Sequence, residues 1–244
     1  MNKTVYRIVL MTLLLVFIFI ADILLGSVTI PLSDFFEYLK GNDWSHPSYE
    51  AIIFEYRLPK ALTACFAGSA LAVSGLLMQS FFRNPLAGPY VLGISSGASL
   101  GVALLILLFS GTFLLSVPLA ACVGSLLVLI VMIWASKRFR SSVSLLILGL
   151  MISYLTGALV GVLQYFSGSE EIQSFVLWGL GSFAKTQWTD LQMMLPVLVL
   201  GLVFAYSRSK ALNSLLLGAS YAQSLGVSIK SIRIQLLYLV GILV

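Results

Sequence analysis

Long apolar stretches alternate with short polar segments along this chain. Each stretch approaches the roughly 20 residues that a helix needs to cross the apolar core of a bilayer. The pattern predicts six complete membrane-spanning helices, at 8–26, 60–82, 91–109, 112–135, 143–166 and 190–206. A seventh stretch opens near Ile232 and is still apolar at Val244, so we expect a C-terminally truncated chain. The expected fold class is an all-α polytopic helical bundle.

Three connections between these stretches are longer than a turn. Segment 27–58 is expected to be a loop in which Pro31 and Asp34 begin a short interfacial helix. Segment 167–189 contains an apolar run that is too short to cross a membrane. Segment 207–229 has apolar residues at helical spacing, with Gly218 and Gly226 placed to divide it into two short helices. Such an amphipathic hairpin either lies on the membrane surface or docks a soluble partner.

Composition supports a membrane protein. Hydrophobic residues make up 59% of the 244 residues and charged residues only 9%, and the mean hydropathy is +1.04. A soluble domain is usually about a quarter charged. The net charge of +5 does not indicate nucleic acid, because the basic residues are scattered among loops. Cys65 and Cys122 lie inside apolar stretches and are expected to be buried without a disulfide.

The first stretch is predicted to be a retained helix. Lys3 and Arg7 precede it, but its apolar core is longer than that of a signal peptide, and no small-residue cleavage site follows. With this N-terminus inside the cell, the cytoplasmic side collects ten of the 14 basic residues: Lys3, Arg7, Arg83, Lys137, Arg138, Arg140, Arg208, Lys210, Lys230 and Arg233. Eight of the nine acidic residues fall outside. This distribution follows the positive-inside rule.

The sequence contains no recognisable catalytic or metal-ligating set. No Gly-x-x-x-x-Gly-Lys-Ser/Thr phosphate loop is present, so any ATP hydrolysis must come from another subunit. The single histidine, His46, falls in a polar loop and is expected to be solvated. The six complete stretches also lack the paired acids that a proton relay would use, which disfavours an ion-coupled transporter.

Small residues cluster on the predicted helices. Gly93, Gly97 and Gly101 are spaced by four and form one ridge, and such ridges let helix backbones approach closely. The stretch 143–166 carries a small and hydroxylated face that either packs or lines a wet path. Between 82 and 91, Asn84, Pro85 and Pro89 indicate a turn that ends one helix before the next begins.

Several motifs occur together in order. They are Arg57-Leu-Pro-Lys60, Gly68-x-Ala-Leu-Ala-x-Ser-Gly75-x-x-x-Gln79, Arg83-Asn84-Pro85-Leu86-Ala87-x-Pro89, Leu92-Gly93-x-x-x-Gly97-Ala98, and Leu215-x-Leu217-Gly218-x-x-x-Ala222-x-x-Leu225-Gly226. In these motifs the chain resembles the FecCD-type permease family of iron–siderophore, haem and cobalamin ABC importers.

The resemblance implies a ten-span permease of the bacterial cytoplasmic membrane, N-terminus inside, with residues 1–244 as one incomplete permease domain. It would import an iron chelate, haem or cobalamin as a homodimer or as a heterodimer with a related permease. Two ATP-binding subunits would dock inside and a periplasmic or lipid-anchored binding protein outside. No cofactor is implied.

The resemblance also implies roles for residues. Arg57 and Lys60 would dock the binding protein, and segment 207–229 would couple to the ATPase through Leu212, Leu215, Leu217, Gly218, Ala222, Leu225 and Gly226. The gate and path would include Ser141, Ser142, Gly149, Ser153, Thr156, Gly157 and Gln164. Gln79, Arg83, Asn84, Pro85, Leu86, Ala87, Pro89 and Gly93 would form a structural motif.

The chain departs from the family pattern at three points. Ala219 stands where the family usually has an acid after the Leu-Gly pair, and Lys60 replaces an arginine and loses its bidentate fork. About three of the family's ten spans are absent. An inactive fragment of such a permease is therefore the alternative function, with an ion-coupled secondary transporter as the remaining one.

Overall fold

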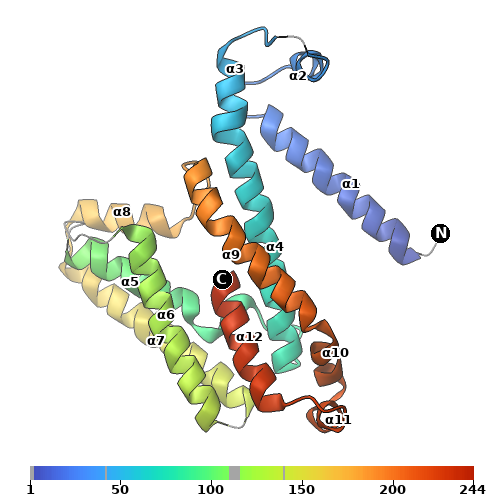
Figure 1. The fold of residues 1–244 in the computed structure, drawn as a ribbon. Helices are drawn as coiled ribbons and strands as arrows, with labels where there is room; N and C mark the ends of the chain where they lie inside the picture. Colours follow the sequence, from blue (N-terminus) through green and yellow to red (C-terminus); the bar gives the residue numbers. More distant parts are fainter. Residues whose placement is uncertain (1–2, 42, 110–115, 140) are drawn as a thin grey trace. The chain divides into compact units, whose positions relative to one another are not determined.

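A computed structural model describes residues 3–41, 43–109, 116–139 and 141–244, and every regular element in these ranges is a helix (Figure 1). The helices are α1 (Lys3–Leu24), α2 (Leu32–Leu39), α3 (Ser48–Ala51), η1 (Ile52–Arg57), α4 (Leu58–Phe82), η2 (Pro89–Leu92), α5 (Ile94–Ala103), η3 (Leu104–Leu108), α6 (Val117–Arg138), α7 (Ser142–Phe166), α8 (Ser169–Gly179), α9 (Trp188–Ser207), α10 (Ser209–Leu217), α11 (Ala219–Ser224) and α12 (Ile229–Leu243).

Five helices in the described ranges are long and apolar enough to cross a membrane. They are Lys3–Leu24, Ser48–Phe82, Val117–Arg138, Ser142–Phe166 and Trp188–Ser207. This agrees with the predicted polytopic helical protein, whereas the predicted count of six complete spans stays unconfirmed. The expected span at 91–109 is a shorter apolar helix, Ile94–Leu108. It begins late because Pro89 opens a 3-10 turn and Gly93 then takes a left-handed conformation (φ 74°). Residues 112–115 of the next expected span lie outside the described residues.

The prediction that 27–58 is a connecting loop was wrong for residues 48–58. A continuous helix begins at Ser48 and runs through α3 and η1 into α4, ending at Phe82. The polar residues Glu50 and Glu55 suggested a loop, but they lie on the exposed side of this helix, while Ile53 is buried. An amphipathic helix can therefore extend an apolar one without any break.

The short helices predicted in 27–58 and in 207–229 are present. Pro31 precedes the first turn of α2, which contains Asp34. Segment 207–229 contains α10 and α11, with Gly218 between them (φ 135°) and Gly226 after them (φ 82°). Both glycines occupy backbone conformations that residues with a Cβ rarely adopt. The apolar run in 167–189 forms α8.

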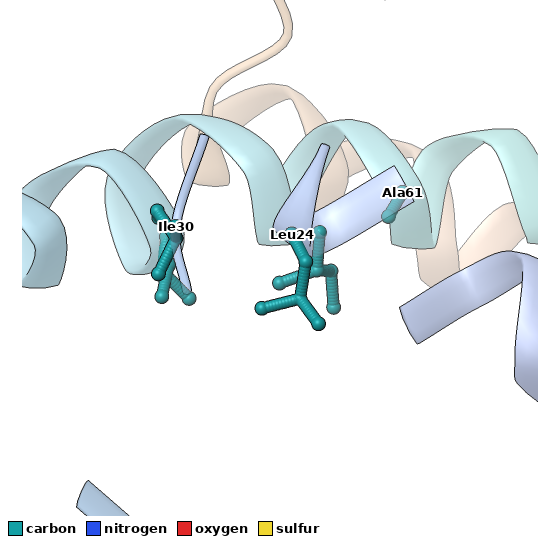
Figure 2. Close-up of a cluster of buried hydrophobic side chains, with 5 residues drawn as sticks. Leu24, Ile30 and Ala61 are labelled. Atoms are coloured by element: carbon teal, nitrogen blue, oxygen red, sulfur yellow. The ribbon is translucent and has the colours of Figure 1, made fainter. Parts of the chain in front are cut away.

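The chain forms two compact units. Unit 1 comprises residues 1–66 and 182–195, and unit 2 comprises residues 67–181 and 196–244. The core of unit 1 is a buried cluster of Ile23, Leu24, Ile30, Ile53 and Ala61. Figure 2 shows the side chains of Leu24 and Ile30 beside the helix that carries Ala61. Phe19, Phe35, Trp44 and Tyr49 pack around this cluster.

Unit 2 is built on the contact between α5 and α6. Gly97 of α5 lies against Gly124 of α6, and a Cβ on either residue would overlap a backbone carbonyl oxygen of the other. The predicted small-residue ridge is therefore a packing surface, at which close backbone approach gives van der Waals contact. Beside it, Val102, Ala103 and Leu107 form a second cluster with Phe175 of α8.

The last helix of the chain packs on α6. Leu236, Leu237, Leu239 and Val240 of α12 are fully buried. Within unit 2, α12 follows directly on the two short helices of segment 207–229, so this packing anchors one end of that segment.

Candidate functional site

Segment 207–229, which we call the coupling hairpin, is held by backbone hydrogen bonds at its turns. The amide of Gly218 donates to the carbonyl of Leu215 (3.1 Å), and the amide of Ala222 donates to the carbonyl of Gly218 (2.9 Å). The amide of Val227 donates to the carbonyl of Ala222 (3.0 Å). These bonds close both helix ends, so the hairpin has a defined shape.

The predicted coupling residues separate into two groups. Leu212, Leu215 and Ala222 are buried, and Leu215 lines a cavity together with residues of α4, α7 and α12. Leu217 and Leu225 are 72% and 59% exposed. A leucine left in water forgoes about 1.5–3 kcal/mol of burial free energy. The exposed pair is therefore available to a partner, whereas the buried group is structural.

Sequence reasoning missed two further members of this exposed apolar surface. Leu216 is 54% exposed and Tyr221 is 48% exposed. We call Leu216, Leu217, Tyr221 and Leu225 the apolar face of the hairpin. Tyr221 lies in α11, beyond the break at Gly218, so no helical periodicity continuing from α10 identifies it.

A cavity of about 300 Å³ adjoins the hairpin in unit 2. It brings together one residue from each of three predicted groups: Arg83 of the structural motif, Ser142 of the gate and Leu215 of the coupling set. These residues are far apart in the sequence, and only the packing of unit 2 places them around one space. Ser141, the other predicted gate residue at this turn, is exposed.

The structural motif forms a tight turn after α4. Arg83 has a left-handed backbone (φ 50°) that ends the helix. The amide of Asn84 donates to the carbonyl of Gln79 (3.2 Å), and the side-chain oxygen of Asn84 accepts from the amide of Leu86 (2.9 Å). Ala87 is buried. The side chain of Asn84 thus satisfies a backbone donor within the turn that was predicted between the two helices.

Gly93, at the end of this motif, packs against α7. A Cβ at Gly93 would lie 2.8 Å from the carbonyl oxygen of Gly149 and 3.2 Å from the hydroxyl of Ser153. A Cβ at Gly149 would in turn overlap the carbonyl oxygen of Val91. The contact therefore joins two predicted groups, the structural motif and the path candidates.

The hydroxyl groups on α7 bond within their own helix. Ser153 donates to the carbonyl of Gly149 (3.0 Å), and Thr156, which is buried, donates to that of Ile152 (2.9 Å). Gly157 has open space around its Cα, and Gln164 is half-buried. The role of α7 as a path lining stays a prediction, with Gly157 and Gln164 on the less packed part of the helix.

In unit 1, Arg57 is almost fully buried, with 9% of its surface exposed. Its guanidinium donates to the carbonyl oxygens of Ile23 (2.8 Å), Leu24 (3.0 Å) and Val28. Because the last carbonyls of a helix lack helical partners and carry partial negative charge, a cation stabilises them. Arg57 thus holds the end of α1.

Lys60 forms an ion pair with Asp22, the ammonium lying 3.1 Å from the carboxylate oxygen. The side chain of Lys60 stays 40% exposed. Of the two predicted docking residues, Lys60 is the one that solvent and a partner can reach directly.

Among the described residues, no group of three or more His, Cys, Asp or Glu lies close enough to hold a metal ion. The fold and these surfaces define a multi-pass helical membrane protein with a short helical hairpin between two of its apolar helices.

Residues 13–244 match the FecCD transport family, and the chain belongs to this family. It is 41% identical over 197 residues to the hemin transport system permease protein HmuU of Yersinia pestis, covering 77% of this chain and 58% of that protein. It is 33% identical over 207 residues to the vitamin B12 import system permease protein BtuC of Photorhabdus laumondii, covering 83% of this chain and 61% of BtuC.

A solved structure shares the fold. It is an inward-facing conformation of a protein assigned to the metal-chelate type of ABC transporter, with a TM-score of 0.82 and 32% identity. The likeness covers 95% of this chain and 71% of that one. The chain spans about three fifths of the length of the curated relatives it matches.

Proposed function

We propose that this chain forms part of the permease subunit of an ABC importer that moves an iron chelate, haem or cobalamin across the bacterial cytoplasmic membrane. Membership of the FecCD transport family supports the transport class. The relatives are named for hemin and for vitamin B12, and the solved structure for a metal chelate. These names span three cargo types, so the proposal keeps the cargo at that level.

The observation that carries the proposal is the apolar face of the coupling hairpin. Leu216, Leu217, Tyr221 and Leu225 are exposed on a segment in which Leu212, Leu215 and Ala222 are buried. Interfaces that bind tightly have a central cluster of well-buried apolar and aromatic side chains. We propose that an ATP-binding subunit covers this face, and that a separate subunit of this kind supplies the energy.

The cavity beside the hairpin suggests how such docking reaches the membrane helices. Leu215 connects α10 to the cavity, and Arg83 and Ser142 line it from the ends of α4 and α7. In the proposed mechanism, closure of two ATP-binding subunits moves the hairpin, and this shared packing transmits the movement to α4 and α7. Ser141, Ser142 and the less packed part of α7 then belong to the gate and path.

For the predicted outer face of the membrane, we propose that Lys60 contributes to docking a periplasmic or lipid-anchored binding protein. Its exposure supports direct contact, while Arg57 supports the same surface indirectly by holding the end of α1. The basic residues of the sequence favour an N-terminus in the cytoplasm. The proposed working form pairs this permease with a second copy or a related permease.

The test is capture of a co-expressed candidate ATP-binding subunit by chains with one leucine changed. Leu217→Asp places a charge on the apolar face, and we expect capture to fall at least tenfold because apolar burial is lost and a carboxylate must be desolvated. Leu180→Asp is the matched control, since Leu180 is 76% exposed and lies in segment 167–189, which is predicted on the outer side of the membrane. The control should capture normally.

Membrane yield of each variant shows that it inserts. Equal capture by the Leu217→Asp chain and the unaltered chain would remove the hairpin from the proposed interface. The hairpin would then be a helix pair that lies on the membrane surface.

A further inference from the structure

Two adjoining cavities in unit 2 meet at Arg233. The first is the 300 Å³ cavity beside the coupling hairpin. The second, of about 480 Å³, lies between the end of α6 and the start of α12. Both are lined by Ile229 and Arg233. Together they carry four cationic side chains, which we call the four-cation surface: Arg83, Lys137, Lys230 and Arg233.

Arg233 holds a defined place between the cavities. Its Nη1 donates to the carbonyl oxygen of Phe139 (2.8 Å), and its guanidinium carbon lies 5.9 Å from the centre of the Phe81 ring. One side of the guanidinium is thus fixed by α6 and the other by α4. Lys137 and Lys230 are exposed beside it. The charges come from α6, α12 and the turn after α4, and packing brings them together.

The segments that build the four-cation surface contain no acidic residue. The sequence has no Asp or Glu in 56–169 or in 191–244, and all cavity-lining residues fall in these two ranges. Positive charges that share a surface repel one another when nothing of opposite sign lies nearby. An anion bound there would relieve that repulsion.

Apolar residues beside the cations indicate which anion fits. Trp134 of α6 is 67% exposed and lies one turn before Lys137, and Phe139 is exposed on the rim of the second cavity. Leu127 and Ile130 continue an exposed apolar strip along the same helix. Tryptophan beside lysine at the end of an apolar helix is typical of the membrane–water interface. A phospholipid satisfies both parts, its phosphate meeting the cations and its acyl chains covering the strip.

We propose that the four-cation surface binds the phosphate headgroup of an anionic phospholipid from the predicted cytoplasmic leaflet. Basic pockets between membrane helices on that side bind anionic headgroups in this way. The proposal is independent of the proposed transport function, because it uses the charges and apolar strip of unit 2 alone.

The test measures binding of fluorescent phosphatidylglycerol to the full chain purified in an uncharged detergent, with phosphatidylcholine as the uncharged-headgroup comparison. Lys137→Gln combined with Lys230→Gln removes two exposed cations without touching a buried contact. Each basic residue near an anionic surface contributes about fivefold to affinity, so we expect a loss of roughly 25-fold for the pair. Lys210→Gln is the control, an exposed lysine that lines neither cavity, and should change affinity less than twofold.

Three outcomes would overturn the proposal. An equal loss of phosphatidylglycerol affinity in the control and the paired variant would mean that the lipid is attracted by the overall positive charge and has no specific site. Displacement of the lipid by millimolar inorganic phosphate would mean a site for the free ion. Unchanged lipid binding in the paired variant, together with lost capture of the ATP-binding subunit, would assign these cations to carboxylates of a protein partner.

Discussion

The guanidinium of Arg57 satisfies two carbonyl groups at the end of α1 and a third in the turn that follows. Such a bond to a charged donor is stronger than a neutral one, at about 1.5–3 kcal/mol. A shorter side chain would remove this charged donor from all three carbonyls, and only the Leu24 carbonyl has a second donor among the bonds described, the amide of Ile30 (3.2 Å). At the scale of single residues, Arg57 therefore stabilises unit 1 by joining its own helix to the end of α1.

Arg57→Gln should lower the thermal unfolding midpoint of the chain in detergent by several degrees, because the three carbonyls lose a charged donor. The unfolding midpoint of Arg57→Lys should lie between those of the unaltered chain and Arg57→Gln, since an ammonium keeps the charge but not the planar fork. Lys185→Gln is the control for loss of one positive charge at an exposed position and should change stability by less than about 0.5 kcal/mol. An unchanged midpoint for Arg57→Gln, with weaker capture of a binding protein, would instead make Arg57 a direct docking residue.

The role of Arg57 could not be read from the sequence. The motif Arg57-Leu-Pro-Lys60 identified two basic residues, but the carbonyls that Arg57 bonds lie about 30 positions earlier, and a carbonyl has no sequence signature. Lys60 is different, because its partner Asp22 is a charged residue. The buried Arg57 and the half-exposed Lys60 therefore have different roles. The sequence does not show this difference, because packing determines which side chain is exposed.

At the scale of helices, α7 has a packed part and an open part. Gly149 lies against the backbone of the turn before α5, while Gly157 has no neighbouring atom within reach of a Cβ. The small residues of α7 thus do not share one function. The packed part fixes the turn that contains Gly93, and the open part is free for the path that we propose.

Gly149→Ala and Gly157→Ala make the same change two turns apart on one helix. At Gly149 the added methyl group meets the carbonyl of Val91, so we expect a loss of about 1–3 kcal/mol from overpacking. At Gly157 the chain should gain up to about 1 kcal/mol, because alanine favours helix over glycine. Thermal unfolding in detergent measures both. Equal effects of the two substitutions would contradict the packing of α7 against the turn before α5.

The elements were predictable where a local signal marks their ends. Pro31 and Asp34 marked α2, and Gly218 and Gly226 marked the coupling hairpin. The helix that begins at Ser48 was missed because its first turns are amphipathic and lack a marked boundary with α4. The length of the helix after Gly93 was overestimated, because apolar composition alone does not show at which residue the preceding turn ends and the helix begins.

At the scale of the whole chain, the predicted site groups meet only through packing. Arg83, Ser142 and Leu215 line one cavity although 132 positions separate the first from the last. The sequence motifs predicted each group but did not predict that the groups line one cavity, because no sequence periodicity links residues on different helices. The family match covers almost the whole chain, and it supports the transport class at this scale.

Cross-linking tests the central claim, that the apolar face of the hairpin docks an ATP-binding subunit. Leu217→Cys, made in a chain whose Cys65 and Cys122 are changed to serine, would be combined in membranes with a single-cysteine ATP-binding subunit and a short thiol cross-linker. We predict one cross-linked species that contains both proteins, and none when Leu180→Cys replaces Leu217→Cys. No cross-link from position 217, or equal cross-linking from both positions, would contradict the account.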